Sequence, residues 1–147
     1  MPDAVRFWVA GVPAPGGSKR GFIHNDRVVM APDCRRTKPW MKRVAEVAAR
    51  RCPAPLDGPL VATFAFVMPR PKYHLGQGRN AGKVKASAPK HHVVPEDVTK
   101  LVRSTEDALR GICYEDDSSI VEQHATKRYG MRPGVLIEIR TIETEGA

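Results

Sequence analysis

Residues 95–117 read PEDVTKLVRSTEDALRGICYEDD, and the fold is built around this stretch. Its apolar residues recur every three or four positions, which predicts one short amphipathic helix with one buried face. The residues of that face are Leu101, Val102, Thr105, Ala108 and Leu109. Gly111 follows the last of them, and glycine is a common C-terminal stop for a helix. The stretch therefore predicts a helix that packs on the rest of the domain and ends near Gly111.

Acidic residues stand at both ends of this predicted helix, in a chain whose formal net charge is +8. Glu96 and Asp97 precede the helix, and Glu115, Asp116 and Asp117 follow it. Hard cations such as Mg²⁺ bind carboxylate oxygens, and two such ions can clamp a phosphodiester and activate a water molecule. Carboxylates concentrated in a basic protein are thus the layout expected of a metal-dependent nuclease.

A purely structural interpretation accounts for the same acids equally well. Asp97 or Thr99 can cap the helix, and the pair Asp116-Asp117 can mark a turn. A helix of about 13 residues is about 20 Å long, so its two ends need not meet in one site. The residue pattern leaves both interpretations open, and with them the distance between the two ends.

The length of 147 residues predicts one domain, and the excess of 24 Lys and Arg over 16 Asp and Glu favours a polyanionic partner. Nucleic acid is the commonest such partner, and solubility alone is the alternative. The three cysteines, Cys34, Cys52 and Cys113, show no CxxC pairing, which argues against a disulfide framework and against a zinc site. The sequence has neither an apolar run of about 18 residues nor a signal-peptide pattern, so we expect a cytoplasmic protein.

The remaining elements are predicted from β-forming runs, apolar periodicity and turn residues. We expect a strand over 5–10, a small hairpin around 24–26, a helix over 37–51 capped by Thr37, a long buried strand over 60–68, and closing strands over 120–129 and 135–142. One stripe of the helix over 37–51 carries Trp40, Val44, Val47 and Ala48, so this face is expected to pack inward. The predicted fold class is α/β of the α+β type, with a mixed sheet packed against two main helices.

A long basic segment is the first candidate for DNA contact. Residues 70–92 contain six Lys and Arg and no acid, and three glycines keep the segment loose. We interpret it as a flexible nucleic-acid-binding arm without regular structure, and plain disorder is the alternative. Its candidate DNA-binding residues are Arg70, Lys72, Lys83 and Lys85. Tyr73 offers a ring on which a base could stack.

A shorter segment near the N-terminus is the second candidate. Ser18, Lys19 and Arg20 follow the pair Gly16-Gly17, and they either cradle a phosphate or belong to a plain surface loop. The histidines at 91, 92 and 124 lack the partners of a histidine-metal nuclease motif, so we expect them to face solvent or DNA.

Three blocks of the sequence, DVTKLVR at 97–103, DALRG at 107–111 and DDSSIV at 116–121, resemble the signature of the RusA family of Holliday-junction resolvases. That signature runs P-D-x-D-K-L-x-R, then D-A-L-T-G, then D-D-x-Q-V-V. The opening Gly11-x-Pro13-x-Pro15, the run MPRP at 68–71 and Lys127 fit the family as well. The resemblance therefore covers most of the chain, and its central block is specific.

The resemblance implies a homodimeric, Mg²⁺-dependent endonuclease, with Mn²⁺ as a substitute, that resolves four-way (Holliday) DNA junctions by paired nicks in DNA recombination and repair. Asp97 matches the first metal-binding aspartate of the family and Asp117 the later essential one, with Asp116 beside it as a further metal candidate. Arg103 stands where the family has a basic residue suited to neutralising charge on the scissile phosphate. The implied catalytic set is Asp97, Thr99, Arg103 and Asp117.

One departure lies inside the signature, where Thr99 replaces a second aspartate of the family. A threonine hydroxyl can ligate Mg²⁺, but it brings no negative charge. Three explanations compete: Thr99 is a weaker ligand, Glu96 or Glu106 supplies the missing charge, or activity is reduced or lost. The alternative function is therefore a non-catalytic branched-DNA-binding protein that keeps the fold but has a degenerate site at Thr99.

Overall fold

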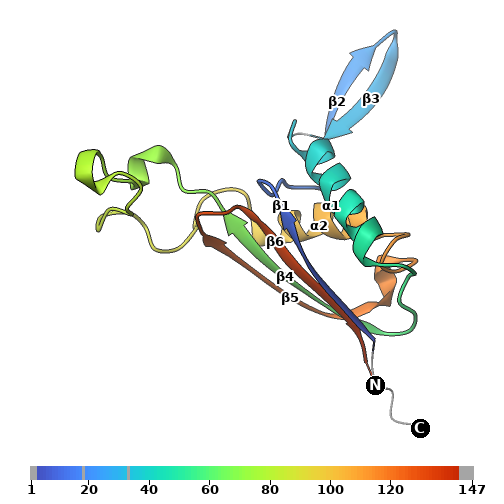
Figure 1. The fold of residues 1–147 in the computed structure, drawn as a ribbon. Coiled ribbons are helices and arrows are strands. Elements are labelled where there is room, and N and C mark those ends of the chain that lie inside the picture. Colours follow the sequence, from blue (N-terminus) through green and yellow to red (C-terminus); the bar gives the residue numbers. More distant parts are fainter. Residues whose placement is uncertain (1–2, 18, 33, 143–147) are drawn as a thin grey trace.

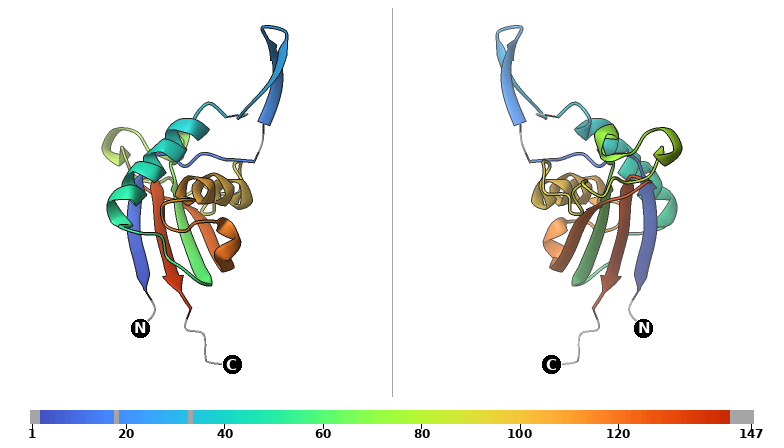
Figure 2. Two further views of the ribbon diagram at one scale, coloured as in Figure 1. Left: turned by 90° about the vertical axis from the view of Figure 1, so that its right-hand side faces the viewer. Right: turned by 90° about the vertical axis from the view of Figure 1, so that its left-hand side faces the viewer.

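The computed structural model describes residues 3–17, 19–32 and 34–142, which form a mixed sheet, two helices on one of its faces and a projecting hairpin (Figures 1 and 2). The elements in chain order are β1 (Ala4–Ala10), β2 (Lys19–His24), β3 (Arg27–Pro32), α1 (Thr37–Arg51), β4 (Leu60–Met68), the 3₁₀ helices η1 (Lys72–His74) and η2 (Gly78–Asn80), α2 (Val98–Leu109), the 3₁₀ helix η3 (Asp117–Ser119), β5 (Ile120–Tyr129) and β6 (Gly134–Thr141). The predicted α+β class with a mixed sheet is confirmed.

The strand order of the main sheet is β1-β6-β4-β5, with antiparallel pairs β1–β6 and β6–β4 and a parallel pair β4–β5. The run LVATFAFVM of β4 is an internal strand between β6 and β5, and it is buried along most of its length, as its continuous apolar character predicts. Although β5 and β6 follow each other in the chain, β4 lies between them. The parallel pairing of β4 and β5 makes α2 part of the crossover connection, which places the helix over the sheet.

Both helices bury the faces that their periodicity predicts. In α1 these are Trp40, Val44, Val47 and Ala48, and in α2 they are Leu101, Val102, Thr105, Ala108 and Leu109. The indole N–H of Trp40 donates to Thr105 Oγ1 at 3.3 Å, and this hydroxyl donates to the Leu101 carbonyl at 2.8 Å. The contact satisfies two buried polar groups and joins α1 to α2 within the core.

The predicted role of Thr37 as the cap of α1 is wrong. The N-cap position is Arg36, which makes no side-chain cap bond, and Thr37 is the first residue of the helix. The Thr37 hydroxyl donates instead to the carbonyl oxygen of Pro15 at 2.7 Å. Thr37 is buried because the segment after β1 lies against it, a tertiary contact that the local sequence does not reveal.

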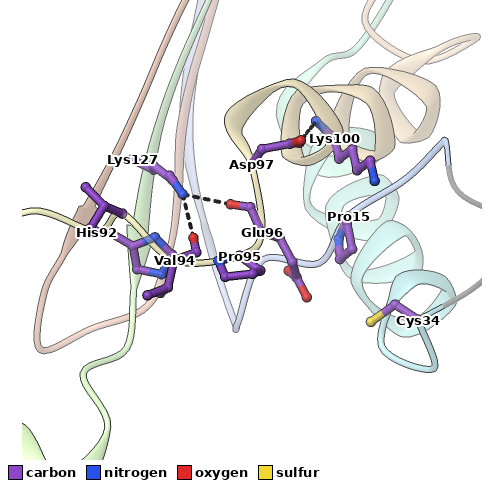
Figure 3. A pocket seen from close by; sticks show the side chains of 10 residues that line it. Pro15, Cys34, His92, Val94, Pro95, Glu96, Asp97, Lys100 and Lys127 are labelled. Carbon is purple, nitrogen blue, oxygen red and sulfur yellow. Dashed lines mark hydrogen bonds between the residues drawn. The ribbon is translucent and has the colours of Figure 1, made fainter.

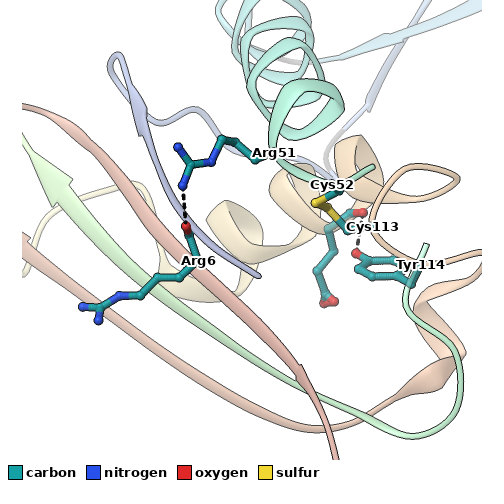
Figure 4. The surroundings of a disulfide bond; sticks show 6 residues. Arg6, Arg51, Cys52, Cys113 and Tyr114 are labelled. Carbon is teal, nitrogen blue, oxygen red and sulfur yellow. Dashed lines mark hydrogen bonds between the residues drawn. A yellow bond between two sulfur atoms is a disulfide. The ribbon is translucent and has the colours of Figure 1, made fainter. Parts of the chain in front are cut away.

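The expectation that the cysteine pattern argues against a disulfide framework is also wrong, because Cys52 and Cys113 form a disulfide (Figure 4). The two residues are 61 positions apart in sequence. Cys52 ends α1 and Cys113 lies in the turn after α2, so helix packing rather than a spacing motif brings them together. Among the residues that the structure describes, Cys34 is the free cysteine.

The hairpin of β2 and β3 turns at Asn25 and Asp26, whose φ angles of 50° and 60° suit a two-residue turn. It projects away from the sheet and helices (Figure 1). Ile23, Val28 and Met30 lie on one of its faces with exposed fractions of 77%, 76% and 58%. A two-stranded hairpin with an uncovered apolar face is marginally stable alone, so this face is suited to a partner.

The segment 70–92 has local structure, contrary to the expectation of a loop without regular elements. It contains η1 and η2, and its two limbs exchange backbone hydrogen bonds from Gly76 N to Lys83 O and from Lys85 N to His74 O. Its flexibility stays a prediction. In the part of the chain that the structure covers, no helix is both long and apolar enough to cross a membrane.

Candidate active site

The N-terminus of α2 carries Asp97 at its N-cap. Asp97 Oδ1 accepts a hydrogen bond from Lys100 N at 2.9 Å, so the carboxylate caps the helix as the structural interpretation predicts. The Asp97 side chain remains exposed, which leaves its second oxygen accessible to a ligand. It lies at a cavity of about 800 Å³ whose wall also includes Lys100, Glu96 and Lys127 (Figure 3).

Lys127 of β5 positions the chain that leads into Asp97. Its ammonium group donates to the carbonyl oxygens of Val94 and Glu96, both at 2.9 Å (Figure 3). These bonds fix the backbone immediately before the N-cap to the sheet. The sequence marked Lys127 as a family position, but its partners became visible only in the structure.

Glu96 lies beside Asp97 and forms an ion pair across the site. Its Oε1 accepts from Arg36 Nη2 at 2.9 Å, and Arg36 Nη1 donates to the carbonyl of Pro13 at 3.3 Å. The other carboxylate oxygen, Oε2, is buried and has no hydrogen-bond partner among the described residues. The charge of Glu96 is therefore partly compensated by Arg36 before any ligand binds.

The glycines that precede Ser18 are used for packing against α2. Gly16 N donates to the Lys100 carbonyl at 2.8 Å, and the Ser104 hydroxyl donates to the Ala14 carbonyl at 2.6 Å. A Cβ at Gly16 would lie 2.9 Å from backbone atoms of Ser104, so this close approach requires glycine. The Gly16 N–H is therefore not free to bind phosphate, which argues against the phosphate-cradle interpretation at this residue.

A second group of carboxylates lies at the opposite end of α2. Asp116 is the N-cap of η3, Asp117 is its first residue, and Glu106 faces them from the last turns of α2. Burial, with the nearby carboxylates of Asp117 and Asp107, raises the pKa of Glu106 to about 7. The Glu106 side chain also accepts from Gln123 Nε2 at 2.7 Å.

Asp116 and Asp117 are neighbours whose carboxyl groups affect each other's pKa, and Asp116 Oδ1 also accepts from Ser118 N at 3.4 Å. Hydrogen bonding to the Asp116 carboxyl group, partial burial and the negative charge of Asp116 raise the pKa of Asp117, and hydrogen bonding to Asp117 and to the Ser118 backbone lowers the pKa of Asp116. Carboxylates that lie close together and have shifted pKa values are common at functional sites. The cluster at this end therefore has the donor chemistry of a hard-cation site.

Tyr114 lies in the core and contacts the C-terminal end of α2, next to the carboxylates of Glu106 and Asp117. Its hydroxyl donates to the backbone carbonyl of Glu106 at 2.8 Å, and burial with the Glu106 charge raises the pKa of that hydroxyl far above its usual range (Figure 4). The adjacent Cys113 is tied to Cys52 of α1 by the disulfide. The turn that delivers Asp116 and Asp117 is thus fixed by a hydrogen bond and a covalent link.

Thr99 and Arg103 lie between the two acidic ends on the exposed side of α2. The Arg103 side chain lies over Gly17, where a Cβ would come within 2.8 Å of Arg103 Cδ. Arg103 also lowers the pKa of Glu106, so its charge acts toward the Asp117 end. Thr99 carries no carboxylate, and Glu106, which lies toward Asp117 and Gln123, does not replace it beside Asp97.

One chain does not bring the predicted metal ligands together. Asp116 and Asp117 are adjacent, whereas Asp97 lies at the other end of α2, a helix of 12 residues and so about 18 Å long. Within the described ranges, no group of three or more His, Cys, Asp or Glu side chains is arranged to hold a metal ion. The carboxylates suit a divalent cation, but within a single chain they lie in two groups, one at each end of α2.

The predicted DNA-binding residues occupy different settings. Lys72, Lys83 and Lys85 are exposed on the 70–92 segment. Arg70 is partly buried: its Nη1 donates to the Pro89 carbonyl at 2.7 Å, and its guanidinium lies 4.4 Å from the centre of the Tyr129 ring. Arg70 therefore anchors the segment to β5.

The N-terminal basic residues are described less fully. Ser18 lies outside the described residues. Lys19 and Arg20 belong to strand β2 of the hairpin.

Sequence reasoning missed His92 and Tyr129. His92 was expected to face solvent or DNA, yet the residue is only 8% exposed and packs at 4.8 Å from the Tyr129 ring. Burial and the nearby Lys127 ammonium lower the pKa of His92. The alternation of β5 places Tyr129 and Lys127 on the same side of the strand, a signal that could have linked them to the segment before Asp97.

Comparison with known proteins agrees with the signature. The family model described as "Endodeoxyribonuclease RusA" matches residues 12–140. A protein of Bacillus subtilis (strain 168) described as "Uncharacterized protein YqaN" is 33% identical over 144 residues, which cover 95% of this chain and 98% of that protein. The chain therefore belongs to the RusA endodeoxyribonuclease family.

Proposed function

We propose that this protein is a divalent-metal-dependent endonuclease that resolves four-way DNA junctions by paired nicks, in DNA recombination and repair. The observation that carries the proposal is the pair of accessible carboxylate groups, Asp97 at one end of α2 and Asp116-Asp117 at the other, at the signature positions of a junction-cleaving family. The formal net charge of +8 supports a polyanionic substrate. Family members generally depend on a divalent metal, and we propose Mg²⁺, with Mn²⁺ as a substitute.

Asp97, Asp116 and Asp117 would hold the metal. When bound, such an ion polarises the scissile phosphate and lowers the pKa of a coordinated water molecule. The residues of this chain supply the setting: Lys127 holds the backbone before Asp97 in place, and Tyr114 supports the turn that carries Asp117. Arg103, exposed between the two ends, is placed to neutralise charge on the phosphate.

A homodimer is the arrangement that makes the two acidic halves one site. A two-fold axis passing near the middle of α2 exchanges the ends of two facing helices, which brings Asp97 of one chain toward Asp117 of the other. Thr99 and Arg103 are exposed on that part of α2, so this face of the helix is available to a second chain. The uncovered apolar face of the β2–β3 hairpin offers further surface for the same association.

DNA contact in this proposal comes from the exposed lysines of the 70–92 segment and from residues 18–20, chiefly through phosphates. Such contacts recognise shape rather than base sequence and weaken steeply with salt. The proposal therefore gives a protein that selects branched DNA by geometry.

A non-catalytic branched-DNA-binding protein is the second candidate, and Thr99 is the observation that favours it. Thr99 adds no charge beside Asp97, while Glu96 is paired with Arg36 and Glu106 lies at the other end of the helix. A site that lacks one carboxylate binds a hard cation more weakly.

Nicking of a synthetic four-way junction in Mg²⁺ or Mn²⁺ separates the two functions. We expect the wild-type protein to introduce paired nicks and Asp117→Asn to bind the junction without cutting it. Asp57→Asn, at an exposed aspartate in the loop before β4, is the matched control and should cut normally. Tight binding without nicking in either metal would establish the binding protein, and nicking gained only by Thr99→Asp would show that the site has decayed.

A further inference from the structure

A second cavity of about 500 Å³ adjoins the cavity beside Asp97. The residues that line both cavities are His92, Val94, Pro95 and Glu96. The rest of the second cavity is formed by rings and apolar side chains, with one cation: Val12, Arg36, Met68, Pro69, Pro71, Tyr73, His74, Pro89 and Tyr129. Its volume is within the range of small-molecule sites, and its walls suit a flat aromatic group.

The rings along this cavity form a continuous wall. Tyr73 meets His74 edge-on at 4.7 Å between centroids, His74 meets Tyr129 at 5.3 Å, and His92 meets Tyr129 at 4.8 Å. Arg70 lies against the Tyr129 ring at 4.4 Å and so holds that ring in place. Tyr73 is 73% exposed, so much of its ring remains available for stacking.

Two buried polar atoms on the shared wall have no hydrogen-bond partner among the described residues: His92 Nδ1 and Glu96 Oε2. His92 as a whole residue is only 8% exposed. Burial and the nearby Lys127 favour the neutral form of the His92 imidazole, so His92 Nδ1 either donates or accepts one hydrogen bond, depending on the tautomer. The Glu96 carboxylate oxygen Oε2 can only accept. Unpartnered buried groups are costly, which indicates that a ligand with both donors and acceptors completes this wall.

We infer that the second cavity receives a nucleobase unstacked from the DNA, while the phosphodiester of the same strand lies in the neighbouring cavity beside Asp97. This inference rests on the proposed function. A nucleobase has the flat π-face that stacks on Tyr73 and the polar edge that pairs with His92 Nδ1 and Glu96 Oε2. The shared wall lets one nucleotide span both cavities, since base and phosphate are joined through a single sugar.

The branch point of a four-way junction is a suitable source for such a base. Base stacking is interrupted there, so withdrawing a base from the stack costs less than in continuous duplex. Lys72, adjacent to Tyr73, and Lys100, at the neighbouring cavity, add cations on either side of the bound nucleotide. Base capture would thereby set which phosphodiester lies beside Asp97.

The test is a double-mutant cycle in which one change is made in the protein and the other in the DNA. Affinity for a four-way junction is measured in EDTA, so that no strand is cut, using intact DNA and DNA with an abasic site at each branch-point position in turn. At one position we expect the wild-type protein to lose about 5- to 150-fold in affinity, the range for losing one base–aromatic stack. Tyr73→Ala should lose a similar factor on intact DNA and nothing further on that abasic DNA.

Two variants serve as controls for the cycle. Tyr73→Phe keeps the ring and should bind as the wild type does. Lys83→Ala removes an exposed cation from the same segment and should weaken binding to intact and abasic junctions by the same factor. Base capture would be overturned if, at every abasic position, the affinity loss of Tyr73→Ala on abasic DNA, expressed as a free energy, equalled the sum of the loss from the substitution and the loss from the missing base. It would also be overturned if Tyr73→Ala bound intact DNA as tightly as the wild type.

The design separates this inference from the proposed function. If the wild-type protein binds and nicks the intact junction but the affinity losses from Tyr73→Ala and the abasic site are additive, the proposed function stands and the base-binding inference fails. A wild-type protein that does not bind the junction at all overturns both.

Discussion

Asp97 is the N-cap of α2, a 12-residue helix about 18 Å long, whereas Asp117 lies near the other end of that helix, beside Glu106, although the family signature assigns both residues to one metal site. The same helix carries Arg103 and Thr99 between them on its exposed side. The separation means that the proposed chemistry depends on how two chains assemble as well as on which residues each chain carries.

Lys127→Met tests how the backbone before Asp97 is positioned. The change removes two hydrogen bonds to carbonyl oxygens and should cost about 1–3 kcal/mol in the free energy of unfolding. It should also lower the nicking rate by about 10- to 100-fold, the range for losing a group that orients a metal ligand. Chemical denaturation and a nicking time course measure the two effects. Arg128→Met, at the exposed neighbouring position of β5, is the control, and an equal loss of nicking there would contradict the role of Lys127.

The disulfide between Cys52 and Cys113 is expected to stabilise the fold substantially. It closes a sequence separation of 61 residues, for which chain entropy gives about 4 kcal/mol. The double variant Cys52→Ser/Cys113→Ser should therefore unfold at a lower denaturant concentration than the oxidised wild type. In excess reductant the two proteins should converge, and Cys34→Ser should leave the difference unchanged. Equal stability of wild type and double variant without reductant would show that the bond does not form in solution.

Glu106 makes stability depend on pH. Its pKa is raised from 4.5 to about 7 in the folded protein, so the unfolded chain loses its proton first as the pH rises. Folding is therefore penalised increasingly between about pH 4.5 and 7, and the penalty is complete above that range. Glu106→Gln should raise the melting temperature at pH 8 relative to wild type and raise it much less at pH 4. Glu46→Gln, at an exposed position on α1, is the control. A pH-independent effect of Glu106→Gln would contradict the assignment.

Much of the fold could be predicted because local patterns there agree with the tertiary structure. The apolar run of β4, the periodicity of α2 and the two-residue turn after His24 each specify their element with little help from distant residues. The order of the strands was not predicted, because the position of β4 between β5 and β6 is decided by the crossover through α2.

The site was harder to predict because it depends on contacts between distant segments. The sequence predicts Asp97 and Asp117 as site residues, which stays a prediction, and the separation of their side chains depends on how the turn between α2 and η3 is folded. The pairing of Cys52 with Cys113 and the burial of His92 likewise arise when α1, α2 and the 70–92 segment pack together. No single-residue signal in the sequence reports such contacts.

Mixing two inactive variants tests the central claim, that Asp97 and Asp117 from two chains act as one junction-cleaving site, most directly. Asp97→Asn and Asp117→Asn are prepared separately, mixed, allowed to exchange chains, and assayed for nicking of a four-way junction in Mg²⁺. Each variant alone should be inactive, whereas the mixed dimer contains one site with both aspartates intact. The account predicts that the mixture regains nicking, at up to about a quarter of the wild-type rate and as single nicks rather than paired ones. A mixture that forms mixed dimers and binds the junction but stays inactive would contradict it.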